Sequence, residues 1–183
     1  MTAGAARLRV LFVCTANICR SPFMELLTRH QVGDALAVSS AGTHGFTDHP
    51  MSEEMADRLR ERGISPDGFR SRPLTGALVE EADLVLTAEA AHRAFVLDEW
   101  PAASRRTFTL GQLAAAVRAD GSGRTGPELL DHLGDRRGNA DPALDVADPY
   151  LRGPEVAARC ATGIDDLLRV VVPALSGTRM IAP

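Results

Sequence analysis

The chain has 183 residues, of which 45% are hydrophobic, and it carries a formal net charge of -4 with a pI of about 5.7. This size and composition suit one domain with a substantial core, and the acidic balance gives no basic field for nucleic acid. No apolar run approaches the roughly 18 residues of a membrane span, so no membrane partner is expected. Three cysteines without a repeating spacing favour a reducing compartment over a disulfide framework or a zinc site, which predicts a cytoplasmic protein without metal.

Two terminal segments lie outside the predicted domain, which covers residues 8–175. Residues 1–7 hold one arginine and no apolar stretch, so they are expected to be a disordered leader rather than a signal peptide. Residues 176–183 are expected to be a flexible tail. Inside the domain, residues 118–147 are rich in glycine and polar residues. They are predicted to be a surface excursion with at most a short helix, rather than a partner-binding element.

Apolar runs and amphipathic stretches alternate along the rest of the chain. Strands are predicted at about 10–14, 35–40, 82–87 and 106–110, and helices at about 22–32, 51–63, 89–98, from 112 and from 154. This alternation indicates a βαβ series with right-handed crossovers. The predicted fold is therefore a single-domain, doubly wound α/β fold with a four-stranded parallel sheet flanked by helices. In such sheets the ligand lies beyond the carboxyl ends of the strands.

Residues 10–23 contain the strongest chemical signal. An apolar run leads into a turn that holds Cys14 and Arg20, and Ser21 and Pro22 open the next helix as its cap and first residue. A loop at a helix N-terminus points several backbone N–H groups inward and makes a concave anion site, to which Arg20 adds a fork matched to two phosphate oxygens. The same donors favour the thiolate form of Cys14, a nucleophile in line with a bound phosphorus. The alternative is a buried strand cysteine and a surface arginine.

The run Val-Leu-Phe-Val-Cys-Thr-Ala-Asn-Ile-Cys-Arg-Ser-Pro at residues 10–22 resembles the signature loop of the low-molecular-weight protein tyrosine phosphatase family, V-C-x-G-N-I-C-R-S-P. The resemblance, which covers about residues 8–172, implies that Cys14 is the nucleophile and that Arg20 binds phosphate. It also implies that Asn17 holds the strained loop backbone and that the Ser21 hydroxyl supports the thiolate. The other predicted members of this phosphate-binding loop after the first strand are Thr15, Ala16, Ile18 and Cys19.

Two later segments also resemble the family. Residues 40–43 read S-A-G-T, and the family places an aromatic residue shortly after this segment on one side of the substrate cleft, which makes Phe46 the candidate. Its alternative is an aromatic anchor on the core. Residues 148–150 resemble D-P-[WYF], which implies that Asp148 is the general acid and then the base, and that Tyr150 is the second wall. Asp145 is the competing acid, but it lacks the following proline.

One position departs from the family pattern. Residues 63–72 resemble the family segment G-I-x4-H-R-A-R, but Phe69 stands where many members carry a histidine that braces the loop asparagine. The departure leaves open how Asn17 is supported, without touching the reacting groups.

The resemblance implies a cysteine-dependent phosphomonoesterase, a phosphoric monoester hydrolase. It would most simply be a protein tyrosine phosphatase that forms a cysteinyl-phosphate intermediate. Its partner would be a phosphotyrosine-containing protein, its product would be inorganic phosphate, and it would need no cofactor, because Arg20 and the loop amides do what a metal cation would otherwise do.

Three alternatives share the loop. A thiol-linked arsenate reductase needs two resolving cysteines downstream, and only Cys160 is present, on the predicted core face of the last helix. A protein arginine phosphatase also carries threonine after the nucleophile, as Thr15 does here, but typically has a second threonine where this chain has Ile18. A non-catalytic phosphoprotein-binding module would keep the pocket and lose the acid, and the presence of Asp148 argues against it.

Overall fold

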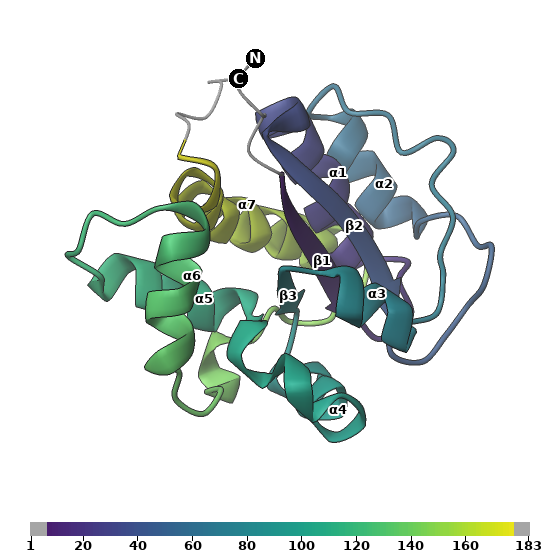
Figure 1. The fold of residues 1–183 in the computed structure, drawn as a ribbon. Coiled ribbons are helices and arrows are strands. Elements are labelled where there is room, and N and C mark those ends of the chain that lie inside the picture. The colour runs from purple at the N-terminus through teal and green to yellow at the C-terminus, as the bar shows by residue number, and fades with distance from the viewer. Residues whose placement is uncertain (1–6, 178–183) are drawn as a thin grey trace, which may run out of the picture.

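Four parallel strands form one sheet in the computed structural model, which describes residues 7–177 (Figure 1). The strands are β1 (Leu8–Cys14), β2 (Leu36–Gly42), β3 (Leu84–Thr87) and β4 (Thr107–Thr109), in the order β2-β1-β3-β4. The carboxyl ends of parallel strands meet at one edge, and the strand order reverses direction between β1 and β3. The predicted doubly wound fold is confirmed, and Cys14 stands at this reversal point.

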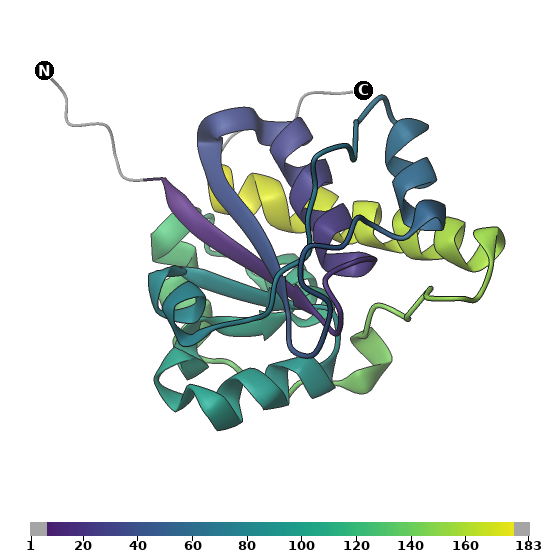
Figure 2. The ribbon, with the colours of Figure 1, turned by 90° about the vertical axis from the view of Figure 1, so that its right-hand side faces the viewer.

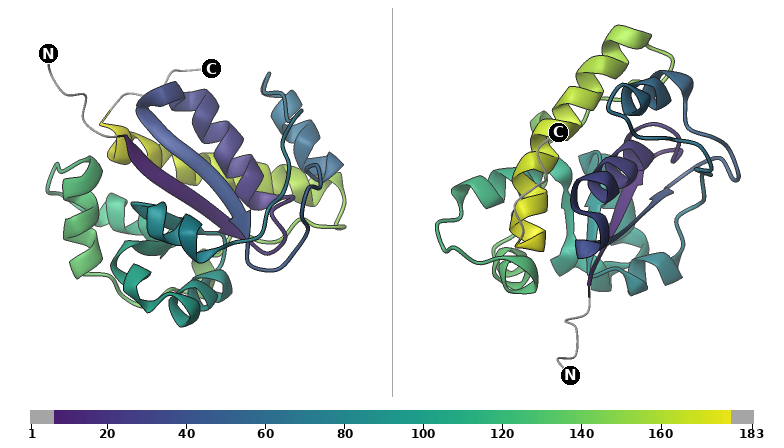
Figure 3. Two further views of the ribbon diagram at one scale, coloured as in Figure 1. Left: turned by 45° about the vertical axis from the view of Figure 1, so that its right-hand side comes forward. Right: turned by 90° about the horizontal axis from the view of Figure 1, so that it is seen from above.

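Helices cover both faces of the sheet. They are α1 (Arg20–Val32), α2 (Glu53–Arg60), α3 (Gly76–Glu81), α4 (Ala90–Glu99), α5 (Leu110–Ala119), α6 (Gly126–Asp135) and α7 (Pro154–Ser176), with the short 3-10 helices η1 (Gly33–Ala35), η2 (Pro101–Arg106) and η3 (Pro142–Leu144). One face packs against α1, α2, α5, α6 and α7, and the other against α3, α4 and η2 (Figure 3). Within residues 7–177, no helix combines the length and apolar composition that crossing a membrane requires.

The central strand β1 shows why its sequence is apolar without interruption. Val10 and Phe12 point into the larger core cluster, and Leu11 and Val13 point into the smaller one on the opposite face. All four are buried. A strand that is covered on both faces needs apolar residues at every position, rather than the alternation of a half-exposed strand.

One helix boundary and one additional helix differ from the prediction. Helix α1 begins at Arg20, and its N-cap residue is Cys19, which makes no side-chain capping bond. Ser21 is therefore not the cap of this helix but lies in its first turn, where its hydroxyl is available to other partners. Helix α3, between the second and third strands, has no counterpart in the prediction. The predicted leader and tail fall mostly outside the described residues, and Ser176 ends α7.

The segment 118–147 is only in part the expected surface excursion. Its glycine-rich stretch at 121–123 is exposed, but α6 packs against α7 and η2. The three leucines of α6 are buried, namely Leu129, Leu130 and Leu133. A single helical turn of apolar residues is too short for periodicity to identify, which is why the sequence does not show that α6 belongs to the core.

Removing one of these leucines tests that conclusion. Leu129 is 1% exposed, so Leu129→Ala should lower the free energy of unfolding by about 2–5 kcal/mol through lost burial and a residual cavity. Leu151→Ala is the control, because Leu151 is 78% exposed and its truncation should cost less than about 0.5 kcal/mol. Urea denaturation measures both. Equal, small losses would mean that α6 is not part of the cooperative core.

Candidate active site

Three carbonyl groups at the turn from β1 to α1 are bound by neighbouring segments outside the loop of residues 15–19. The carbonyl of Cys14 accepts from the backbone N–H of Thr43 at 3.0 Å, that of Thr15 from His44 at 2.9 Å, and that of Ile18 from Ser52 at 2.8 Å. The described peptide bonds are all trans, so the N–H of each of these peptide groups points the opposite way, toward the inside of the loop. These contacts therefore orient three amides, those of Thr15, Ala16 and Cys19, in the way that the predicted anion site requires.

Two glycines let the segment after β2 approach this loop closely. A Cβ at Gly42 would lie 2.7 Å from the carbonyl oxygen of Thr15, and one at Gly45 would lie 2.7 Å from the Cα of Ala16. Neither distance is possible for a real side chain. The S-A-G-T segment therefore forms an outer support for the loop, and Figure 2 shows the segments after β1 and β2 meeting at the carboxyl edge of the sheet.

Cys14 is buried, and its sulfur has a hydroxyl neighbour. Its Sγ lies 3.1 Å from the Oγ of Ser21. The amide of Asn17 donates to the same Ser21 oxygen at 2.8 Å, so this oxygen acts as an acceptor there, and its own hydrogen has two acceptors within reach, the sulfur and, at 3.4 Å, the carbonyl of Ala41. A thiolate at Cys14 would be the nearer acceptor and the only charged one of the two, so it can receive a hydrogen bond from Ser21, which is the role that the resemblance implies for this serine.

Asn17 is held without the family histidine. Its backbone adopts a left-handed φ of 55°, and its side chain is completely buried. The side-chain amide also donates to the Ser40 hydroxyl at 2.9 Å, and its oxygen accepts from the backbone N–H of Arg72 at 2.9 Å. Ser40 in turn donates to the carboxylate of Glu25 at 2.6 Å. Phe69, which stands where many family members have a histidine, packs against the core. Ser40 and the backbone of Arg72 therefore bind the Asn17 side chain without that histidine.

The Arg20 guanidinium is 2% exposed and is fixed at one end. Its Nη1 donates to Glu89 and, at 2.9 Å, to the carbonyl of Val146. Its Nη2 lies 3.5 Å from the Thr15 hydroxyl and 3.4 Å from Asp148, and its buried Nε has no hydrogen-bond partner. The Nε and Nη2 edge is the one that can bind two oxygens of an anion side by side.

The surroundings of Arg20 keep its guanidinium protonated. Burial alone would lower the pKa of Arg20, but Cys14, Glu89 and Asp148 around it raise this pKa above its ordinary value. The fork therefore stays cationic at every pH at which the protein is folded.

The two candidate acids have different surroundings. Asp148 is about half exposed, lies near Arg20, and accepts from the backbone N–H of Tyr150 at 3.4 Å. Asp145 accepts from the backbone N–H of Ala90 at 2.8 Å, and burial raises the pKa of its carboxyl. Asp145 thus ties its loop to the start of α4, while Asp148 lies at the mouth of the site.

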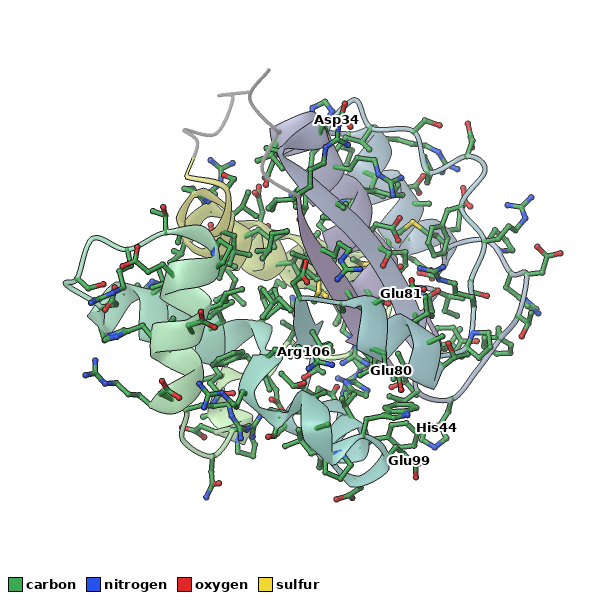
Figure 4. The ribbon with its side chains drawn as sticks, in the orientation of Figure 1. Asp34, His44, Glu80, Glu81, Glu99 and Arg106 are labelled. Atoms are coloured by element: carbon green, nitrogen blue, oxygen red, sulfur yellow. The ribbon has the colours of Figure 1, made fainter. Side chains whose placement is uncertain are left out.

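The two predicted wall residues are exposed. Phe46 is 41% exposed and follows Gly45, and Tyr150 is 43% exposed and follows Asp148 by two residues. The segment that carries Phe46 also contacts α4, because the rings of His44 and Phe95 meet edge to face with centroids 5.2 Å apart. Figure 4 shows His44 beside the end of α4 that carries Glu99.

The other two cysteines have neutral thiols. Burial raises the pKa of Cys19 to about 11, and its Sγ donates to the Ser52 hydroxyl at 3.2 Å. Burial also raises the pKa of Cys160 to about 12, and Cys160 lies in the core as predicted. Within the described part of the chain no group of three or more His, Cys, Asp or Glu side chains is arranged to hold a metal ion.

The sequence analysis assigned no role to three residues that contact the loop members, namely Ser40, Glu89 and His92, or to Glu25, which contacts Ser40. Glu89 had a usable signal, since it follows the third strand at the edge where Cys14 ends the first strand. His92 lies one helical turn later. The residues that the structure does bring together as predicted are Cys14, Thr15, Ala16, Asn17, Ile18, Cys19, Arg20 and Ser21, with Asp148 beside them.

The contact at Gly42 can be tested directly. Gly42→Ala forces the loop backbone away from β2, so we expect the affinity for inorganic phosphate to fall about tenfold or more, with a loss of about 1–3 kcal/mol in stability. Calorimetric titration with phosphate and urea denaturation measure the two effects. Gly163→Ala is the control, because nothing lies within 4 Å of that position. An unchanged phosphate affinity in Gly42→Ala would mean that the loop does not depend on this contact.

Comparison with known proteins agrees with this geometry. The family model described as low molecular weight phosphotyrosine protein phosphatase matches residues 9–122. The low molecular weight protein-tyrosine-phosphatase Etp of Escherichia coli K12 is 34% identical over 124 residues, which are 68% of this chain and 83% of that protein.

Two solved structures are also similar. The YwlE arginine phosphatase from Geobacillus stearothermophilus has a TM-score of 0.70 and 27% identity, covering 93% of this chain and 91% of that one. A cysteine-to-serine mutant of YwlE arginine phosphatase with a phosphorylated active-site serine has a TM-score of 0.73 and 25% identity, covering 94% and 98%. The chain therefore belongs to the low molecular weight phosphotyrosine protein phosphatase family.

Proposed function

We propose that this protein is a cysteine-dependent protein tyrosine phosphatase, in which Cys14 is the nucleophile, Arg20 the phosphate-binding cation and Asp148 the general acid. The observation that carries the proposal is that the buried Nε of Arg20 has no hydrogen-bond partner within the protein. This donor belongs to the same turn from β1 to α1 as the inward-pointing amides and the buried Cys14. Such an arrangement complements a phosphate dianion and leaves a sulfur beneath it.

The reaction proceeds in two steps. The Cys14 thiolate attacks phosphorus, the S–P bond forms, and the bond from phosphorus to the ester oxygen breaks while Asp148 gives that oxygen its proton. Water then attacks the cysteinyl phosphate, Asp148 accepts a proton from this water, the S–P bond breaks and inorganic phosphate leaves. The hydrogen bond from Ser21 stabilises the thiolate as it departs. The phosphorylated active-site serine of the YwlE mutant supports a covalent step for this family.

The surroundings of the loop favour an aryl phosphate. Phe46 and Tyr150 are exposed aromatic residues on the segments after β2 and before α7, and they are the side chains that would contact a phenyl ring as the walls of a cleft. Arginine phosphatase is the second candidate, because similar proteins carry that name and Thr15 follows the nucleophile here. Against it, Ile18 is buried with the core and offers no second hydroxyl. The exposed Asp148 near Arg20 also makes a binding module without turnover the weaker reading.

The partners follow from the same chemistry. The substrate is a phosphotyrosine-containing protein, and the product is inorganic phosphate. We place the protein in the cytoplasm, because the three cysteines are all free thiols and a reducing compartment keeps them so. We propose no nucleic-acid or membrane partner, because the net charge is -4 and the sequence has no apolar run of membrane-spanning length.

Hydrolysis of phosphotyrosine and phosphoarginine peptides, measured side by side, tests the function. We expect a higher kcat/KM for the phosphotyrosine peptide. Cys14→Ser should bind inorganic phosphate nearly as well as the wild type while losing turnover, because the amides and Arg20 remain and the thiolate does not. A preference for phosphoarginine would favour the second candidate, and residual turnover within about tenfold of the wild type would remove Cys14 from the mechanism.

The assignment of the acid has its own signature. Asp148→Asn should slow phosphate esters with basic leaving groups by about 10²–10⁴-fold and should have little effect on esters whose leaving group is stable as an anion. The measurement is single-turnover phosphorylation of Cys14 across substrates whose leaving-group pKa spans several units. Asp145→Asn is the control and should do much less, because the new amide oxygen can still accept from Ala90. Equal losses for every substrate would place the acid elsewhere.

A further inference from the structure

Two side chains at the start of α4 contact the phosphate-binding loop and take no part in the steps above. Glu89 is the N-cap residue of α4, and His92 lies in its first turn. Glu89 accepts a hydrogen bond from Nη1 of Arg20, and the Nε2 of His92 lies 2.8 Å from the Thr15 hydroxyl. The two side chains are also close to each other, with 3.9 Å between His92 Nε2 and Glu89 Oε2.

We propose that Glu89 and His92 are positioning residues for phosphoryl transfer, and this rests on the proposed function. Glu89 fixes the plane of the Arg20 guanidinium, and His92 fixes the Thr15 hydroxyl beside its other end.

Glu89 acts on Arg20 by occupying the nitrogen that the phosphate does not need. Nη1 has two acceptors, the Glu89 carboxylate and the Val146 carbonyl, whereas Nε has none and Nη2 has only two long contacts. A planar group with one end held can present only its opposite edge. Without Glu89, the guanidinium would keep only the neutral carbonyl at that end and could turn toward the carboxylate of Asp148, 3.4 Å from Nη2.

His92 acts as a neutral hydrogen-bonding group. Burial and the charge of Arg20 lower the pKa of His92 to about 4, and the other charged or titratable groups that act on it are Glu89, Asp148 and His44. Because the Thr15 oxygen can accept from Nη2 of Arg20, its hydrogen is free to point at His92 Nε2. This gives a chain from Arg20 through Thr15 to His92.

The other ring nitrogen of His92 argues against a role in packing alone. His92 is 5% exposed, and its Nδ1 is buried without a hydrogen-bond partner. A buried polar atom without a partner costs stability, which a phenylalanine of similar shape would avoid. The bond at Nε2 is therefore the contact that distinguishes histidine from an apolar residue here.

The start of α4, which carries Glu89 and His92, is itself held by hydrogen bonds. The backbone N–H of Ala90 donates to Asp145 at 2.8 Å, and the Thr87 hydroxyl donates to the carbonyl of Glu89 at 3.0 Å. The first turn of α4 thus cannot move without moving both β3 and the loop that carries Asp148.

Double-mutant cycles test the proposal, with 4-nitrophenyl phosphate hydrolysis, inorganic phosphate affinity by calorimetry, and the melting temperature as readouts. Glu89→Ala should lower kcat/KM and phosphate affinity about 10- to 100-fold, and Glu89→Gln, which keeps an acceptor, should recover most of the loss. In an Arg20→Lys background, Glu89→Ala should cost less than about threefold, because the group that it orients is gone.

The second cycle pairs His92→Phe with Thr15→Val. His92→Phe alone should lower kcat/KM about three- to tenfold without lowering the melting temperature, and it should have almost no effect once the Thr15 hydroxyl is absent. Glu99→Gln, at the exposed end of the same helix, is the control and should match the wild type.

The proposal would be overturned if the losses in kcat/KM of the two single variants simply added in the double variants of both cycles. It would also be overturned if kcat/KM fell only in proportion to the melting temperature while the phosphate affinity stayed unchanged. If Glu89→Ala does not fold, Glu89→Asp, whose shorter side chain withdraws the carboxylate from Nη1 of Arg20, takes its place in the cycle against Arg20→Lys. The phosphate titrations also separate this proposal from the proposed function. A wild type that binds phosphate but hydrolyses no ester would end the phosphatase assignment, and the cycles in phosphate affinity would still decide the roles of Glu89 and His92.

Discussion

The arrangement of the site depends on the hydrogen bonds of one buried asparagine. Asn17 holds a left-handed backbone in the middle of the loop, a conformation that costs energy for any residue with a side chain. Its side chain joins Ser21 on α1, Ser40 on β2 and the backbone of Arg72. Three segments from different parts of the chain thus keep the loop in the shape that turns its amides inward.

Arg20 is oriented by elements other than those that hold Asn17. Its contacts come from the start of α4 and from the loop before α7, far from Arg20 in the sequence. The loop backbone and the guanidinium are therefore stabilised by different elements. A change on α4 can disturb the cation while the ring of amides stays intact, and a change at Ser40 can do the reverse.

The sequence predicts the parts of this protein that local pattern or motif determines. The apolar run of β1, the turn from Cys14 to Arg20 and the buried stripe of α7 were all found in this way. Burial of α6 was not, because Leu129 and its neighbours fill only one turn. The contacts of Glu89 and His92 were also missed, since they depend on how β3 lies beside β1, which is tertiary information. The support of Asn17 by Glu25 through Ser40 is of the same kind.

Three hydrogen bonds hold the backbone of the Asp148 loop at Asp145 and Val146, just before Asp148. Asp145 accepts from Ala90, the N–H of Val146 donates to Ala88 at 2.9 Å, and the carbonyl of Val146 accepts from Arg20. These contacts hold the backbone just before Asp148, so the carboxylate that we propose as the acid lies 3.4 Å from Arg20 in the substrate-free structure. If Asp148 is the acid, its position beside the phosphate-binding loop does not depend on a segment that closes over the substrate.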